Sequence, residues 1–236
     1  MFLEKKVRNR CLITQLFLTL SLAVSAQKIS NLKPYFQTSS RLGLVIVTHS
    51  IEYVGQNGVP LGRFGAFTVK WKTKSGGKYD KALAAVEPTV DPTEKLKSLY
   101  SDLYQSKGKK IAAVNVNFDT TFSEFKKRST GGENYFEKDI RFLGEKLHLD
   151  ELLIVFVRYG LTMSSRLGIE ISGGGFVSVD SQIINLHDNS IYMSQDSNSR
   201  SSLDGPWDSA DYYFLKSCIS EAIEKVIKKE KKKYEW

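Results

Sequence analysis

The chain has 236 residues, a formal net charge of +8 and an apolar content of 41%. This length suits a single folded domain with a sizeable hydrophobic core. Its two cysteines, Cys11 and Cys218, are too few for the disulfide framework of a small secreted domain.

The N-terminal residues predict a secretory signal peptide. The basic start holds Lys5, Lys6, Arg8 and Arg10. A mostly apolar run then extends over residues 12–24, and Ala26 precedes a favourable cut before Gln27. The run is shorter than the roughly 20 residues that span a bilayer, although an uncleaved anchor remains the alternative. Cys11 lies upstream of the run, whereas a lipoprotein signal needs a cysteine at the cut.

We therefore expect residues 1–26 to be removed and residues 27–236 to form a single α/β domain. No second long apolar run follows. The mature protein should then be periplasmic or secreted, neither lipid-anchored nor membrane-spanning.

In the first half of the domain, residues 44–54 are rich in β-branched side chains and predict a strand. Residues 64–71 (FGAFTVKW) predict its return as a hairpin. Residues 81–86 indicate a short helix. Asp91, Pro92 and Glu94 form a helix-start signal. Five residues form the apolar face of that helix, which Gly108 ends: Leu96, Leu99, Tyr100, Leu103 and Tyr104.

In the second half, residues 109–118 (KKIAAVNVNF) alternate as in a strand. An amphipathic helix is predicted from the spacing of Phe136, Ile140, Leu143 and Leu147. Residues 151–161 (ELLIVFVRYGL) predict a central strand buried on both faces.

Residues 174–186 and 190–195 predict a hairpin whose turn holds His187, Asp188 and Asn189, and residues 196–205 indicate a loop. A last helix should begin after Pro206 with Asp208 as its cap, bury Cys218, and fray into a basic end. The order of elements predicts an α+β (mixed α/β) fold. It should have one mainly antiparallel or mixed sheet of about six strands with three main helices.

Three consecutive glycines in EISGGGFVSVD (residues 170–180) invite an active-site interpretation. A phosphate loop needs a following lysine and a helix, whereas Val177 and Val179 predict a strand. A nucleophile turn around Ser172 lacks its first glycine and also needs a helix. We therefore interpret Gly173–Gly175 as a hinge or bulge entering a hairpin strand.

Metal and catalytic motifs are not found. His49, His148 and His187 have no histidine or cysteine partner at metal-ligand spacing. Residues 196–207 fail the EF-hand pattern because Arg200, Ser201 and Trp207 replace required residues, although a looser ion site stays open. We assign no catalytic, cofactor-binding or metal-binding residue and expect no cofactor.

The C-terminal residues form a lysine cluster. It comprises Lys225, Lys228, Lys229, Lys231, Lys232 and Lys233. A solvated helix end explains such a run. The alternative is that these lysines make weak contact with anionic lipid, with Tyr234 and Trp236 at the membrane–water interface. Nucleic acid is not an expected partner of an exported protein.

The order of elements from Lys110 to Lys229 resembles exported α/β domains of the bacterial envelope. LHLDELLIVF and NLHDNSIY are similar to the helix end and hairpin turn of the TolB amino-terminal domain and of curli-secretion lipoproteins. The first half looks like uncharacterised exported bacterial proteins. The resemblance implies a binding or assembly role, with an envelope protein or cell-surface component as partner, and transfers no catalytic residue.

The sequence thus favours a non-enzymatic, exported cell-envelope protein. One alternative is an exported hydrolase with His49 or His187 as general base. The other is a peripheral membrane-surface protein that uses the C-terminal lysines.

Overall fold

The structure is a computed structural model that describes residues 35–36, 39–49, 51–54, 79–118, 122–126, 134–166 and 169–234. The chain divides into two compact units, Met1–Ser39 and Ser40–Trp236, and the sheet and its helices belong to the second. The expected signal peptide (residues 1–26) and the expected hairpin strand at residues 64–71 lie outside the described residues.

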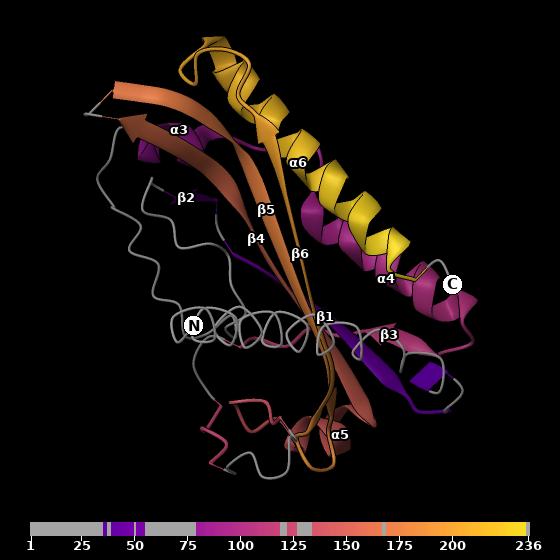
Figure 1. Ribbon diagram of the computed structural model, residues 1–236. Coiled ribbons are helices and arrows are strands. Elements are labelled where there is room, and N and C mark those ends of the chain that lie inside the picture. Colours follow the sequence, from indigo (N-terminus) through magenta and orange to yellow (C-terminus); the bar gives the residue numbers. More distant parts are fainter. Residues whose placement is uncertain are drawn as a thin grey trace, which may run out of the picture. The chain divides into compact units, whose positions relative to one another are not determined.

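A mixed sheet forms the centre of the second unit (Figure 1). Its strands are β1 (Leu42–Thr48), β2 (Glu52–Val54), β3 (Ile111–Ala113), β4 (Glu151–Arg166), β5 (Ile169–Asn185) and β6 (Ile191–Ser202). Their order is β3-β1-β4-β5-β6, and β2 also pairs with β4. The pairs among β1, β2, β3 and β4 are parallel, whereas β4, β5 and β6 are antiparallel. This confirms the predicted mixed sheet and α+β class.

Four helices accompany these strands in the described part of the chain: α3 (Asp80–Ala85), α4 (Pro92–Ser106), α5 (Phe142–Leu147) and α6 (Tyr213–Lys232). Figure 1 shows α4 and α6 side by side along the sheet. α6 contacts β5 and β6, and α4 contacts β1. The side chains beneath them are the odd-numbered residues of β4, such as Val155 and Val157, because a strand alternates its side chains between faces.

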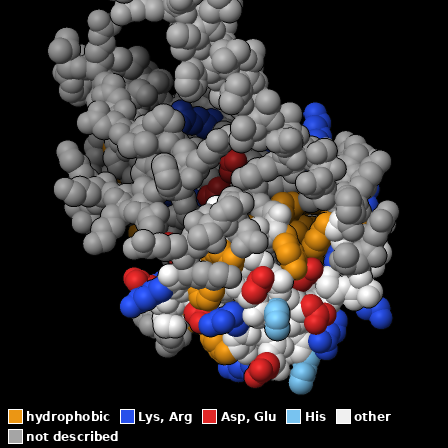
Figure 2. Space-filling model, turned by 60° about the horizontal axis from the view of Figure 1, so that its bottom comes forward, with side chains coloured by type: hydrophobic (Ala, Val, Ile, Leu, Met, Phe, Trp, Pro, Cys, Tyr) orange, Lys and Arg blue, Asp and Glu red, His pale blue; other side chains and the backbone are white. Residues whose placement is uncertain are grey.

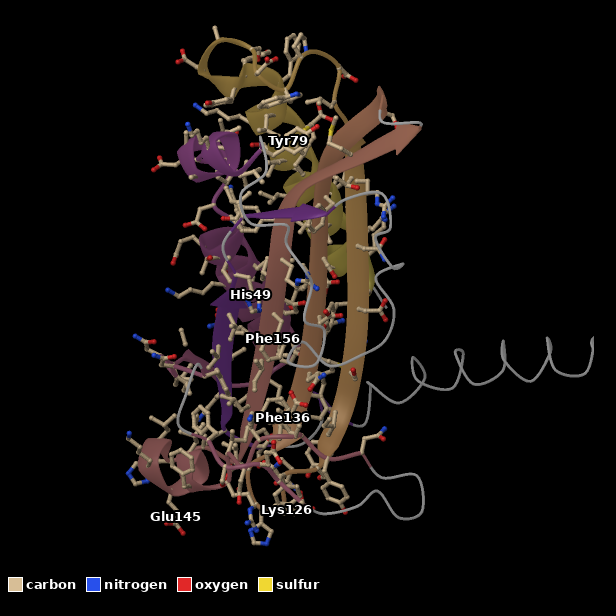
Figure 3. All side chains as sticks on the ribbon, turned by 90° about the vertical axis from the view of Figure 1, so that its left-hand side faces the viewer. His49, Tyr79, Lys126, Phe136, Glu145 and Phe156 are labelled. Carbon is tan, nitrogen blue, oxygen red and sulfur yellow. The ribbon has the colours of Figure 1, made fainter. Side chains whose placement is uncertain are left out.

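The opposite face of the sheet carries an apolar core near α5. Its members are Val45, Phe118, Phe136, Ile140, Leu143, Leu152, Ile154, Phe156, Ile184 and Leu186. Figure 3 shows Phe156 in mid-sheet and Phe136 closer to α5, which carries Glu145. Both faces of β4 are therefore covered at this end, and residues 151–157 are all buried, as predicted for a central strand.

The start of α4 follows its sequence signals. Asp91 Oδ1 accepts hydrogen bonds from the backbone N–H groups of Thr93 (2.8 Å) and Glu94 (3.4 Å), and Pro92 occupies the first turn. Gly108 follows the helix with a φ of +83°, a left-handed conformation that glycine adopts without strain.

The predicted helix through Phe136 and Ile140 is wrong, because α5 covers only Phe142–Leu147. The side chain of Asn189 holds the preceding backbone in an irregular path. Its Nδ2 donates to Phe136 O (2.8 Å) and Lys138 O (2.9 Å), and its Oδ1 accepts from Ile140 N (3.2 Å). Phe136 and Ile140 are buried by tertiary contacts in the core. Their spacing in the sequence matches that of a helix face, although they are not in a helix.

The predicted loop at residues 196–205 is also wrong for its first part, because β6 extends to Ser202. Three small side chains, Ser197, Ser199 and Ser201, are buried on the face towards α6. Asp208 does not cap α6, which begins at Tyr213 after a left-handed Tyr212. The burial of Cys218 is confirmed, at 2% exposure.

Two further strands are shorter than predicted. The strand at residues 109–118 is limited to Ile111–Ala113, and the strand at residues 44–54 is broken between Thr48 and Glu52. The glycines at 173–175 form neither a hinge nor a bulge. They pair in register with Met163, Thr162 and Leu161, and the register shifts of β5 lie elsewhere, next to Ser165 and Ile184.

Candidate functional site

A hollow of about 890 Å³ opens where α5 meets the turn between β5 and β6. Figure 2 views this end of the molecule and shows hydrophobic side chains exposed between charged ones. We call this hollow the α5 groove. Its lining includes Phe122, Asp139, Arg141, Phe142, Asp150 and His187.

The apolar part of the α5 groove is a pair of stacked aromatic rings. The rings of Phe142 and Phe122 lie 5.6 Å apart between centroids at 30°. Phe122 in turn contacts the buried Phe118, at 5.2 Å between centroids. Phe142 is 50% exposed, although it is the first residue of α5 and adjoins the core residue Leu143. The groove therefore presents an exposed aromatic ring that is anchored to the core through Phe122 and Phe118.

Two arginine–aspartate pairs line the rim. Arg41 donates from Nε and Nη2 to the two carboxylate oxygens of Asp150 (3.2 and 3.0 Å), and Arg141 binds Asp139 in the same way (2.9 and 2.7 Å). These hydrogen bonds lower the pKa of both aspartates. The guanidinium of Arg141 also lies 5.1 Å from the ring centroid of Phe125. Bidentate pairs of this kind fix side-chain orientation.

The histidines do not converge on this groove. His187 lines it. The start of β1 lies at the same end of the sheet, because Leu42 and Asn185 both pair with Glu151. His49, in contrast, follows the opposite end of β1. At 3.3 Å per residue, the length of β1 separates the two histidines by about 20 Å. His148 is exposed in a left-handed turn after α5. Among the described residues, no three His, Cys, Asp or Glu side chains gather in a metal-binding group.

Sequence reasoning missed a polar group formed by the buried Lys109 and Glu151 and the half-buried Ser40. Ser40 Oγ donates to Glu151 Oε2 (2.8 Å), and Lys109 Nζ donates to Ser40 Oγ and lies 3.5 Å from Glu151 Oε2. A serine–lysine pair is nucleophilic only when a neutral lysine accepts the serine proton. Here that proton points at Glu151, so the geometry fits an ion pair that anchors the starts of β1 and β4.

This polar group had no signal in the sequence, because its three members come from distant segments that only the sheet brings together. Burial lowers the pKa of Lys109, and Glu151 opposes this shift. The adjacent carboxylate therefore favours the charged amine.

A pair of carboxylates faces each other across β5 and β6, where Asp180 pairs with Asp196. Burial, followed by the repulsion of Asp196, raises the pKa of Asp180 to about 6, and the nearby Arg158 and Lys233 oppose the shift. A folded-state pKa above the unfolded value means that the native state binds more protons between pH 4 and 6. The charge on Asp180 therefore costs stability above about pH 6, and this cost disappears as the pH falls towards 4.

Replacing Asp180 with asparagine should stabilise the protein at pH 7.5 by about 1–3 kcal/mol. The gain should vanish near pH 4, where the native aspartic acid is already neutral. Thermal unfolding of both proteins across this pH range measures the effect. Asp196→Asn is the control, since Asp196 is exposed and should give a smaller gain. An equal gain for D180N at both pH values would contradict the assignment.

The lysine-rich C-terminal part of α6 was expected to fray. This expectation is wrong, because the helix extends to Lys232. Lys225 Nζ donates to Ser201 Oγ (2.9 Å), Lys229 Nζ to Asn198 O (2.7 Å) and Lys233 Nζ to Asp196 O (3.0 Å). These bonds attach one row of the helix to β6, the edge strand.

The last described residue, Tyr234, is 1% exposed and packs against Tyr100 and Tyr104. It is therefore part of the core. The alternative that placed Tyr234 at a membrane interface is wrong for this residue. Trp236 lies outside the described residues.

No protein-family model and no curated protein matches the chain. Solved structures with similarity include lipoprotein GNA1162 from Neisseria meningitidis, at 11% identity over 80% of this chain and 99% of that chain, with a TM-score of 0.35. The hypothetical protein CT253 from Chlamydia trachomatis is 8% identical over 84% of this chain and 98% of that one, with a TM-score of 0.33. Protein XCC0632 from Xanthomonas campestris is 8% identical over 84% and 86%, also at 0.33.

The first of these is described as a lipoprotein and the second as a hypothetical protein. Because the TM-scores and identities are low, no site of these structures is transferred to this chain. Within the part of the chain that the structure describes, no helix has the length and apolarity needed to cross a membrane.

Proposed function

We propose that the chain is an exported bacterial envelope protein that binds a protein partner through the α5 groove. The observation that carries this proposal is the half-exposed Phe142, stacked on Phe122 and framed by the Arg41–Asp150 and Arg141–Asp139 pairs. An apolar centre with a polar rim is the usual anatomy of a protein-binding surface.

The physical argument concerns the cost of leaving Phe142 in water. Exposed aromatic surface is unfavourable for an isolated chain, and aromatic side chains that fill a partner's pocket dominate binding energy. The bidentate arginine pairs hold the rim in place, so little side-chain entropy would be lost when a partner binds. The predicted signal peptide supports an envelope partner.

Site-specific photo-crosslinking in intact cells tests the proposal. A photoreactive phenylalanine at Phe142 should capture a discrete partner. The control position is Tyr213, which is 65% exposed at the opposite end of the sheet, at the start of α6. The Arg141→Ala variant should reduce capture from position 142, because it removes one rim pair.

The comparison between the two positions decides the result. Capture of the same adducts from positions 142 and 213 would indicate collisions at the surface and contradict a specific groove. Absence of any adduct from position 142, with the variant folded and exported, would also overturn the proposal.

A further inference from the structure

Five lysines from two distant segments meet at one end of the molecule. Lys107 and Lys110 lie in the connection between α4 and β3, and Lys228, Lys231 and Lys232 lie in the last two turns of α6. We call these five residues the basic end. Figure 1 shows the C-terminal end of α6 beside the end of α4 and near β3.

Aromatic contacts fix this arrangement. The ring of Tyr234 lies 5.8 Å from that of Tyr104 between centroids. The backbone N–H groups of Lys107 and Lys109 both donate to Tyr104 O, at 3.1 and 3.0 Å. The connection that carries Lys107 is therefore bound to the same turn of α4 that receives the C-terminal tyrosine.

The orientation of α6 separates its lysines into two groups. Lys225, Lys229 and Lys233 bind β6, as described above. At 3.6 residues per turn, Lys228, Lys231 and Lys232 fall on the side of the helix opposite its buried row, and all three are exposed. Lys110 is exposed as well. Among the described residues of α4 and α6, the two exposed carboxylates nearest to these lysines are Asp102 and Glu224, so positive charge predominates on this part of the two helices.

We propose that the basic end binds the anionic surface of a lipid membrane. All five charges are lysines, whose ammonium groups are point charges on flexible stems. Such groups suit the negative charge that is distributed over an anionic lipid surface, whereas oriented binding of a single phosphate typically uses arginine. Clusters of this size are attracted to anionic lipid within about one Debye length, which is roughly 10 Å at 0.1 M salt.

This surface differs from the simple C-terminal tail suggested by the sequence. Truncating the tail would remove Glu230 and Tyr234 from the core, so only point substitutions can test the charges. Two variants divide the basic end: K228Q/K231Q/K232Q and K107Q/K110Q. A third, K81Q/K95Q/K126Q, removes three exposed lysines from other places and serves as the charge-matched control.

The experiment measures flotation of the full chain with vesicles of phosphatidylcholine, with or without about one third phosphatidylglycerol. We expect K228Q/K231Q/K232Q to weaken partition onto the anionic vesicles roughly tenfold to a hundredfold, and K107Q/K110Q to weaken it about fivefold or more. The control should change it less than about twofold. All variants share the same N-terminus, so the difference between them reports the substituted lysines.

Raising the salt concentration should release the wild-type protein from anionic vesicles in proportion to its charge contacts. A loss as large in the control as in the basic-end variants would overturn the proposal. Partition onto anionic vesicles that does not change with salt concentration would also overturn the proposal. Retention on a sulfated polysaccharide without vesicle binding would assign the basic end to a soluble polyanion and thereby reject the membrane.

Discussion

Replacing Gly175 with alanine is expected to destabilise the protein by about 3 kcal/mol or more. A Cβ atom at this position would lie 2.3 Å from Cys218 O, 2.5 Å from Cys218 C and 2.6 Å from Ile219 N. These are backbone atoms of α6, which cannot rotate away as a flexible side chain would. Either α6 or β5 must therefore move, and the buried contacts of Ile219 and its neighbours would be lost. Urea unfolding followed by circular dichroism measures the loss.

Gly108→Ala provides the control, because this glycine is required for a different reason. No atom lies within 4 Å of a Cβ built at Gly108, but its φ is +83°. Alanine there should cost only about 1 kcal/mol through backbone strain. If G175A proved as mild as G108A, the close approach of α6 to β5 would be wrong.

The role of Gly175 could not be predicted from the sequence. The residues that follow it correctly indicated a strand, since strand alternation is a local property. The reason for the glycine lies in Cys218, which is on a helix that the chain forms only after one further strand, β6. Glycine in a strand indicates a bulge, a bend or a close backbone approach, and only the tertiary structure distinguishes them.

Local chemistry was the most predictable part of the fold. The Asp91–Pro92 start of α4 depends on hydrogen bonds within one turn, and the apolar run of β4 reflects burial on both faces. The segment around Phe136 was mispredicted because Asn189, which is distant in sequence, binds its backbone. A helix pattern and an irregular buried segment can therefore share the same apolar spacing.

The candidate sites were less predictable than the fold. Each component of the α5 groove looks ordinary in the sequence: Phe122 follows a polar stretch, and Asp150 ends a turn. The groove exists because residues 122–123, α5, the turn before β4 and the β5–β6 turn meet at one end of the sheet. The lysine cluster was visible in the sequence, but its division into β6-bound and exposed groups depends on the orientation of α6.

Replacing Glu230 with alanine is expected to cost about 3–5 kcal/mol of stability. Glu230 is fully buried, accepts a hydrogen bond from Tyr100 Oη at 2.5 Å, and pairs with Lys233 Nζ at 2.7 Å. Burying a carboxylate costs several kcal/mol, which these two partners offset. Burial also raises the pKa of Tyr100 well above its usual value, so the phenol remains a donor. Without Glu230, the buried Tyr100 hydroxyl would lose this acceptor, whereas Lys233 Nζ would keep its hydrogen bond to Asp196 O.

A double-mutant cycle separates the Tyr100–Glu230 bond from general packing. Y100F and E230Q should each destabilise the protein, and their combination should cost less than the sum by about 1–2 kcal/mol. Glu94→Gln is the control, because Glu94 pairs with Lys97 at 3.5 Å on the exposed surface of α4 and should contribute less than about 0.5 kcal/mol. Additive effects of Y100F and E230Q in urea unfolding would rule out the coupling. A measured coupling would show that the C-terminal turn of α6 stabilises the α4–α6 layer, and with it the basic end that the two helices form.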